Sequence, residues 1–177
     1  MGMLGFLGAG KMATALARGF VASGKVAAGD LVASDPVPAA REAFARETGG
    51  RVLDSNAGVA SAARVLFLAV KPDQLTDVLG GLGESLGPGH LLVSIAAGVP
   101  LAKIEAAANG ARCIRVMPNT PALVGASASG FSVGTTSTRE DAALVQGLLS
   151  AVGVALEVKE KLLDAVTGLS GSGSPSA

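Results

Sequence analysis

A glycine-rich turn near the N-terminus contains the residues whose types and spacing point most directly to chemistry. Residues 8–13 read GAGKMA, which fits the pattern G-x-G-x-x-G/A. In this pattern Gly8 permits a tight bend, Gly10 lets a diphosphate approach the backbone, and Ala13 lets the next helix pack closely on the preceding strand. The amides at the N-terminus of that helix attract anions. The turn therefore predicts dinucleotide binding, with a plain structural turn as the alternative.

A carboxylate follows this turn at a distance that suits a ribose contact. Asp35 comes after Ala13 at close to the spacing of roughly 20 residues expected for that role. A carboxylate there accepts hydrogen bonds from the 2′-hydroxyl of NAD and repels the 2′-phosphate of NADP. Ser34 and Arg41 lie nearby in the sequence and could instead serve a phosphate. Alternatively, Asp35 and Pro36 only start a turn and cap the next helix, so the choice between NADH and NADPH stays open.

Strand-like and helix-like segments alternate along the chain and predict the elements that position these residues. Met12, Leu16 and Phe20 recur at every fourth position, which is typical of one helix face. Strands are expected over 3–7, 31–34, 51–53, 65–70, 91–95, 112–117, 126–133 and 154–158. Helices are expected over 11–23, 38–48, 73–79, 101–108 and 139–151, with a short one after Asn56. The alternation predicts an α/β fold with a Rossmann-like, doubly wound and mostly parallel sheet.

The C-terminal part of the sequence carries further local signals. The helix over 139–151 is expected to open with a capping box, in which Ser137 and Glu140 each satisfy an unpaired amide. A new helix is expected over 160–166, followed by a Gly/Ser loop over 168–173. Either this tail is a disordered end, or the gene product continues beyond it.

Composition excludes several classes of function. Fourteen basic and fourteen acidic residues give no net charge, so a partner that is nucleic acid or an anionic membrane is not indicated. No apolar run approaches the roughly 18 residues of a membrane span. With one cysteine and one histidine, a disulfide framework, a zinc site and a histidine-based triad are not expected. Cys113 is expected to pack as a small hydrophobe and His90 to be structural. No signal peptide is expected, and the chain is expected to be cytoplasmic.

Five segments, taken in order, resemble pyrroline-5-carboxylate reductase. They are LGFLGAGKMA at 4–13, LFLAVKP at 66–72, SIAAGV at 94–99, RVMPNTP at 115–121 and DAVTGLSGSG at 164–173. The resemblance implies reduction of 1-pyrroline-5-carboxylate to L-proline with NADPH or NADH. It also implies a dinucleotide-binding domain over 1–158 and, over 159–177, the start of a helical dimerisation domain that this chain truncates. Where that domain is present, the resemblance implies a homo-oligomer.

The resemblance also implies which residues surround the ligands. Those implied for the cofactor are Gly8, Ala9, Gly10, Lys11, Met12, Ser34, Asp35, Asn56, Ala69, Val70, Lys71, Pro72, Ala96, Ala97, Met117 and Asn119. Those implied near the substrate are Asn119, Thr120, Glu160, Ser170 and Ser172.

This chemistry requires no protein nucleophile, so the absence of a catalytic triad does not argue against it. A cyclic imine is already electrophilic at carbon, so a hydride can be transferred by alignment and charge complementarity alone. The loop at 170–177 reads SGSGSPSA, where the family reads SGSGPA, and this departure puts the substrate loop in doubt. Two other functions remain open: a truncated NAD(P)H-binding module without turnover, and another imine or deazaflavin-dependent NADP reductase.

Overall fold

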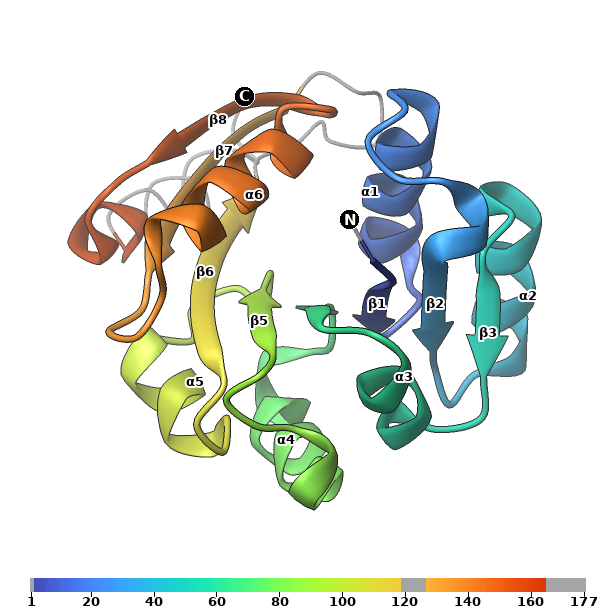
Figure 1. Ribbon diagram of the computed structural model, residues 1–177, viewed down its shortest axis with the longest axis horizontal. Coiled ribbons are helices and arrows are strands. Elements are labelled where there is room, and N and C mark those ends of the chain that lie inside the picture. The colour runs from blue at the N-terminus through green and yellow to red at the C-terminus, as the bar shows by residue number, and fades with distance from the viewer. Residues whose placement is uncertain (1, 119–126, 165–177) are drawn as a thin grey trace, which may run out of the picture.

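The protein is an α/β structure built on a single sheet. The computed structural model describes residues 2–118 and 127–164. Their eight strands lie in the order β3-β2-β1-β4-β5-β6-β7-β8. The strands are β1 (Leu4–Leu7), β2 (Leu31–Ser34), β3 (Arg51–Leu53), β4 (Val65–Leu68), β5 (Leu91–Ser94), β6 (Arg112–Pro118), β7 (Ser127–Val133) and β8 (Gly153–Glu157). Strands β1 to β6 are parallel, β7 runs antiparallel to β6, and β8 runs parallel to β7 (Figure 1).

Helices cover both faces of this sheet. They are α1 (Lys11–Ala22), α2 (Pro38–Thr48), α3 (Asn56–Ala62), α4 (Leu75–Leu82), α5 (Leu101–Ala107) and α6 (Arg139–Leu149). Short 3₁₀ turns lie at Ala28–Asp30, Pro72–Gln74 and Gly83–Ser85. Helices α1, α2 and α6 pack into one apolar core cluster, and α3, α4 and α5 pack into the other. The strand order, with helices on both faces, is that of the doubly wound dinucleotide-binding fold, as the alternating pattern predicted.

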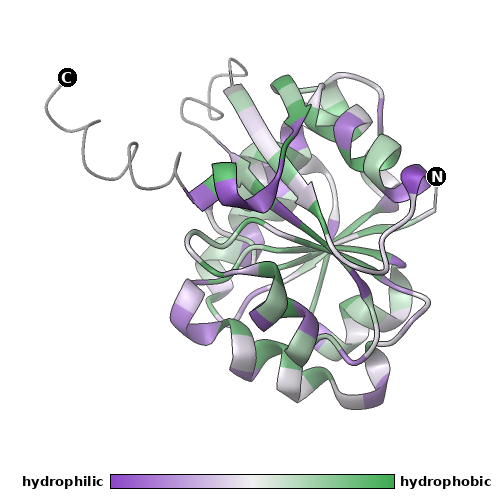
Figure 2. Ribbon diagram, turned by 90° about the vertical axis from the view of Figure 1, so that its left-hand side faces the viewer, coloured by the Kyte–Doolittle hydropathy of each residue, from purple (hydrophilic) through white to green (hydrophobic). Residues whose placement is uncertain are grey.

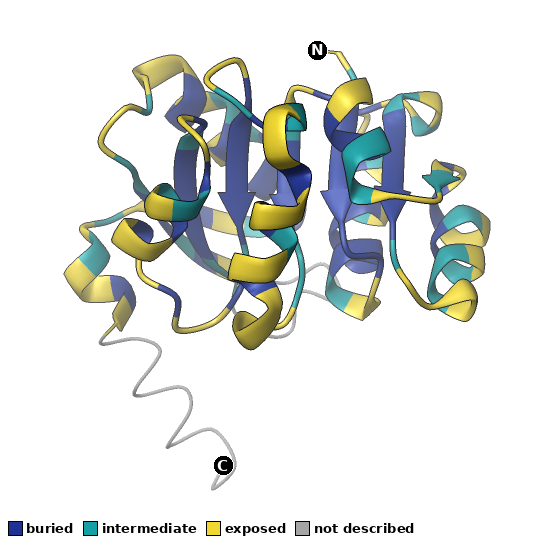
Figure 3. Ribbon diagram, turned by 90° about the horizontal axis from the view of Figure 1, so that it is seen from below, coloured by how far each residue is buried: buried dark blue, intermediate teal, exposed yellow. Residues whose placement is uncertain are grey.

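The strands are apolar because both of their faces are covered. Every residue of β1, β2 and β5 is buried. Figure 2 shows the green, apolar strands at the centre, and Figure 3 shows them in the dark blue of buried residues. Four phenylalanines form one aromatic group beneath α1 and α2; the ring centroids of Phe6 and Phe67 lie 5.1 Å apart, and those of Phe20 and Phe67 lie 5.6 Å apart. This packing fixes α1 against β1 and so positions the glycine-rich turn between them.

Several expected boundaries differ from the structure. The strand expected over 65–70 ends at Leu68, and the helix expected over 73–79 begins as a 3₁₀ turn and becomes α4 only at Leu75. Residues 160–164 are helical, as expected for that part of the 160–166 segment. After β4 ends, the amide of Ala69 still donates to β1, and residues 70–71 lie beyond the strand, at the edge where parallel strands end.

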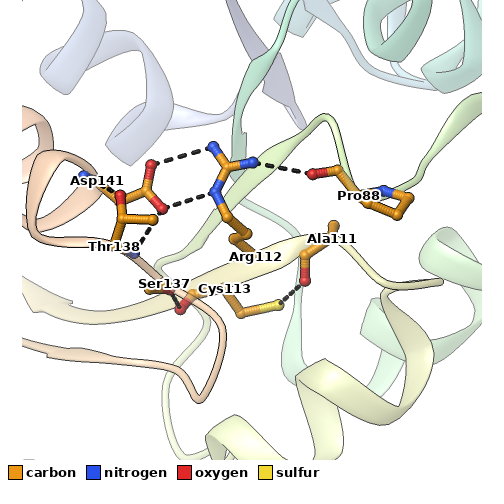
Figure 4. Close-up of polar contacts among 7 residues, drawn as sticks. All are labelled: Pro88, Ala111, Arg112, Cys113, Ser137, Thr138 and Asp141. Atoms are coloured by element: carbon orange, nitrogen blue, oxygen red, sulfur yellow. Dashed lines mark hydrogen bonds and ion pairs between the residues drawn. The ribbon is translucent and has the colours of Figure 1, made fainter.

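The expected capping box at Ser137 and Glu140 is wrong by one residue. The box is formed by Thr138, whose hydroxyl accepts from the amide of Asp141 at 3.1 Å, while the Asp141 carboxylate accepts from the amide of Thr138 at 3.0 Å. Ser137 instead donates to the carbonyl of Cys113 at 2.6 Å (Figure 4). Arg112 decides the register, because its guanidinium donates two hydrogen bonds to Asp141 and holds that carboxylate at the helix start.

The histidine and the cysteine are structural, as expected. His90 is buried; its Nδ1 accepts from the amide of Gly87 at 3.2 Å, and its Nε2 lies 2.7 Å from the carbonyl oxygen of Ala60. Cys113 is fully buried in β6, and burial, with a smaller effect from the charge of Glu105, raises the pKa of its thiol to about 12. Both side chains are shielded from solvent, and the raised pKa keeps the Cys113 thiol protonated at neutral pH.

Two kinds of feature are absent from the described part of the chain. None of the helices in 2–118 and 127–164 is long and apolar enough to cross a membrane. Within the same ranges, no group of three or more histidine, cysteine, aspartate or glutamate side chains is placed to hold a metal ion.

Candidate functional site

The glycine-rich turn lies where the strand order reverses, between β2 and β4. Gly8 has a φ of +103°, which glycine adopts without strain, and a Cβ there would collide with the backbone carbonyl of Ala69. Its amide donates to the carbonyl of Ser34 at 2.9 Å, while the amide of Ala69 donates to the carbonyl of Leu7 at 2.8 Å. The turn is therefore held against both neighbouring strands, at the point where ligands bind in open α/β sheets.

Open space lies in front of the second glycine. A Cβ built on Gly10 would have no atom within 4 Å, although the residue has ordinary extended backbone angles. Gly10 is the N-cap of the twelve-residue helix α1, whose first turn has no side-chain cap and no acidic residue. The first turn of α1 thus lacks a side-chain cap and begins beside an open space, an arrangement that attracts an anion.

A cleft of about 390 Å³ continues from this turn along the carboxyl ends of β4, β5 and β6. That volume is within the range of small-molecule sites, roughly 300–1,000 Å³. Its lining residues are Gly10, Lys11, Met12, Ala13, Ala69, Val70, Lys71, Ile95, Ala97, Met117 and Pro118. Residues from four separated segments of the sequence therefore meet at one edge of the sheet. The cleft is mostly apolar, and Lys11 and Lys71 bring two positive charges to it.

Eight of the sixteen residues expected for the cofactor line this cleft. Ala96 is buried in the core beneath it, and Pro72 is exposed outside it. Ile95 and Pro118 line the cleft but were not expected there. Each is a direct neighbour of an expected residue at the end of β5 or β6, so the strand-end rule itself could have found them.

The residues expected at the adenosine end lie together at the ends of β2 and β3. The hydroxyl of Ser34 donates to Oδ1 of Asn56 at 2.5 Å. Asp35 bonds to the backbone with both carboxylate oxygens: Oδ2 accepts from the amide of Ala9 and Oδ1 from the amide of Val37, each at 2.9 Å. Arg41 donates to the backbone carbonyl of Asp35 at 2.7 Å. The carboxylate therefore braces the glycine-rich turn and caps its own turn, a contact across 26 residues that the sequence alone did not reveal.

On the substrate side, the structure describes only Glu160 among the expected residues. Its Oε2 accepts from Nη1 of Arg115 at 2.9 Å and from the amide of Leu101 at 2.6 Å. The expectations at Asn119, Thr120, Ser170 and Ser172 lie outside the described residues.

The residues at the cleft fit a dinucleotide. The open space at Gly10 and the uncapped amides of α1 suit a pyrophosphate, and the apolar cleft along the ends of β4 to β6 suits a flat ring system. The cations of Lys11 and Lys71 add positive charge on the same side.

Comparison with known proteins agrees with this fit. Residues 3–98 match the family model described as "NADP oxidoreductase coenzyme F420-dependent". Pyrroline-5-carboxylate reductase of Pisum sativum is 44% identical over 170 residues, which cover 96% of this chain and 62% of the relative. The enzyme of that name from Methanosarcina acetivorans is also 44% identical, over 96% of this chain and 63% of the relative. The chain thus spans just over three-fifths of the length of these relatives, and its resemblance to pyrroline-5-carboxylate reductase is confirmed.

Solved structures give the same result. A pyrroline-5-carboxylate reductase from Coxiella burnetii superposes with a TM-score of 0.91 at 30% identity, covering 99% of this chain and 66% of that one. The pyrroline carboxylate reductase of Plasmodium falciparum, solved with NADP bound, superposes with a TM-score of 0.86 at 30% identity, covering 98% of this chain and 64% of that one. Because the family model matches more than half of the sequence, the chain belongs to the family described as coenzyme F420-dependent NADP oxidoreductases.

Proposed function

We propose that this chain forms the cofactor-binding part of a reductase that uses NADPH to reduce 1-pyrroline-5-carboxylate to L-proline. The observation that carries the proposal is the cleft at the strand-order reversal, where an open glycine turn meets the ends of β4, β5 and β6. The names of the relatives supply the substrate.

In this proposal the residues of the chain bind and orient. The amides at the start of α1 and the open face of Gly10 receive the pyrophosphate, and Lys11 and Lys71 balance its charge. Ala97 and Met117 form apolar walls that hold a flat ring in one orientation and exclude water. When bound, a reduced nicotinamide supplies the hydride. No side chain of the chain is assigned to proton transfer.

NADPH is proposed over NADH on the strength of two observations. The matched family is described by NADP, and the Plasmodium falciparum structure contains NADP. Asp35 would repel a 2′-phosphate, but both of its oxygens already accept from backbone amides, and Arg41 lies beside it. These contacts only partly offset the repulsion that argues for NADH.

The proposal extends to the regions and surroundings of the chain. We assign 1–158 to the dinucleotide-binding domain and 159–177 to the start of a helical region through which subunits associate. A homo-oligomer and a cytoplasmic location complete the proposal. Light scattering on the product of the full reading frame tests the association, and a monomer would contradict it.

The deciding experiment combines binding with turnover. NADPH is titrated into the protein by fluorescence, and its oxidation is followed with 1-pyrroline-5-carboxylate on the product of the full reading frame. Tight NADPH binding together with turnover is expected. Binding without turnover of this imine would point to a binding module.

A second candidate, reduction of a deazaflavin by NADPH, is favoured by the description of the matched family. The same assay with coenzyme F420 in place of the imine separates the two. Turnover with F420 alone would replace the proposed substrate.

A further inference from the structure

An arginine is buried inside the sheet, in β6. Arg115 pairs in register with Ser94 of β5 and Ser132 of β7, and its own side chain is only 1% exposed. Nη1 donates to Glu160 at 2.9 Å and to Asp164 at 2.8 Å. Nη2 is buried and has no hydrogen-bond partner among the described residues. One half of the guanidinium is thus paired and the other half is not.

Stability does not explain a guanidinium at this position. A buried nitrogen without a partner loses its hydration and gains nothing in return. Replacing a buried ion pair by an apolar residue of similar size is often neutral or stabilising. The carboxylates of Glu160 and Asp164 are 32% and 62% exposed, so water can solvate them if the arginine is removed. An unsatisfied buried group of this kind calls for a functional explanation.

The contacts of Glu160 lead from Arg115 toward the cleft. The same carboxylate oxygen that accepts from Arg115 also accepts from the amide of Leu101 at 2.6 Å. Leu101 begins α5 and comes directly after the turn 95–100, which joins β5 to α5. Ile95 and Ala97 of this turn line the cleft. Two hydrogen bonds therefore join the rigid centre of β6 to the far end of a turn that forms one wall of the proposed cofactor site.

We propose that Arg115 is a positioning residue that fixes, through Glu160, the cleft-lining turn 95–100. The inference rests on the proposed function in taking NADPH as the ligand of the cleft. It assigns Arg115 no contact with the ligand; the guanidinium acts on the wall through one shared carboxylate. Asp164, the second partner of Nη1, keeps the helical residues 160–164 against the sheet so that Glu160 stays in reach.

The test compares two arginines of the same strand. Arg115→Met should leave the melting temperature almost unchanged, raise amide hydrogen exchange over residues 95–101, and weaken NADPH binding roughly three- to tenfold. Arg115→Lys, which retains a cation, should recover part of the affinity. Arg112→Met is the matched control, because Arg112 also pairs with a carboxylate but holds α6 (Figure 4). It should lower the melting temperature and leave the NADPH affinity unchanged.

A fourth variant tests whether the effect of Arg115 passes through the carboxylate of Glu160. Glu160→Ala should reproduce the changes of Arg115→Met, and the double variant should be no worse than either single one, since all remove the same link. Additive losses, or unchanged exchange over 95–101 in Arg115→Met, would overturn the inference. If the unaltered protein fails to bind NADPH, the proposed function fails, while the exchange data still decide the role of Arg115.

Discussion

Single residues at the glycine-rich turn give the sharpest tests of the proposed site. Gly10→Val should fold normally, because its Cβ meets no atom within 4 Å and its backbone angles suit any residue. The side chain would fill the space assigned to the pyrophosphate. NADPH binding should weaken by about 2 kcal/mol or more, roughly thirtyfold, in calorimetry.

The control for this variant is Gly29→Val. Gly29 also has open space around its Cβ position, but it lies in the 3₁₀ turn Ala28–Asp30, outside the cleft. The Gly29→Val variant should bind NADPH with the same affinity as the unaltered protein. Unchanged affinity in Gly10→Val would show that the phosphates bind elsewhere.

Asp35 tests the choice of cofactor. Its carboxylate is held beside the glycine-rich turn by the amide of Ala9, so its charge lies at the edge of the proposed site. Asp35→Ser should shift the ratio of NADH to NADPH affinities toward NADPH by roughly ten- to hundredfold, as expected for removing a nearby like charge partly screened by solvent. Titrations with both cofactors measure the ratio. A ratio that stays constant while stability falls would assign Asp35 to bracing and capping alone.

At the scale of secondary-structure elements, an ion pair at the start of α6 makes the stability of the protein depend on pH. Burial disfavours the charged form of Asp141, but hydrogen bonds and charge from Arg112, with the amide of Thr138, outweigh it and hold the pKa of the carboxyl below its ordinary value. A folded-state pKa below the unfolded one gives stability that is present above the unfolded pKa and is lost as pH falls through the folded value.

Asp141→Asn should therefore destabilise the protein at pH 7. The loss of stability should be smaller at acidic pH. The difference in unfolding free energy between the variant and the unaltered protein should shrink as pH falls below the ordinary carboxyl pKa of 3.8. Urea unfolding at pH 7 and pH 3 measures it. A difference that is independent of pH would mean that the carboxylate charge does not stabilise α6.

Two glycines in helices should respond to alanine in opposite directions. A Cβ on exposed Gly80 in α4 meets no atom within 4 Å, so Gly80→Ala should stabilise the protein by roughly 0.5–1 kcal/mol through helix propensity. A Cβ on Gly19 in α1 would collide with Cγ1 of Val152, so Gly19→Ala should destabilise it. Thermal unfolding of both variants checks the contrast, and a gain at Gly19 would contradict the close packing of α1 on the segment before β8.

Local patterns were enough to predict the alternating elements and the glycine-rich turn. Periodicity depends on neighbouring residues and located the elements, whereas the resemblance to pyrroline-5-carboxylate reductase supplied most of the residues that line the cleft. The capping box was displaced because its register depends on Arg112, 29 residues from Asp141. The pairing of Arg115 with carboxylates 45 and 49 residues later depends on the reversal of direction at β7, which no local pattern encodes.

For the molecule as a whole, the sheet joins two parts with different roles. Strands β1 to β6 bring the glycine-rich turn and the cleft walls to one edge, while β7 and β8 run the opposite way and are followed by Glu160. The contact of Glu160 with Arg115 and Leu101 connects this second part to the cleft. We therefore expect residues 160–164 to influence the proposed cofactor site, although none of them lines the cleft.

The buried thiol of β6 can be used to measure how often the interior of the protein opens. Cys113 is the single cysteine of the chain, and with a pKa raised to about 12 it cannot react with a thiol reagent until the strand is exposed. The rate of labelling therefore measures how often β6 becomes exposed under native conditions. NADPH at a hundred times its dissociation constant should slow labelling roughly a hundredfold if opening disrupts the cleft. A labelling rate that does not change when NADPH is added would mean that β6 separates from its neighbours while the cofactor stays bound.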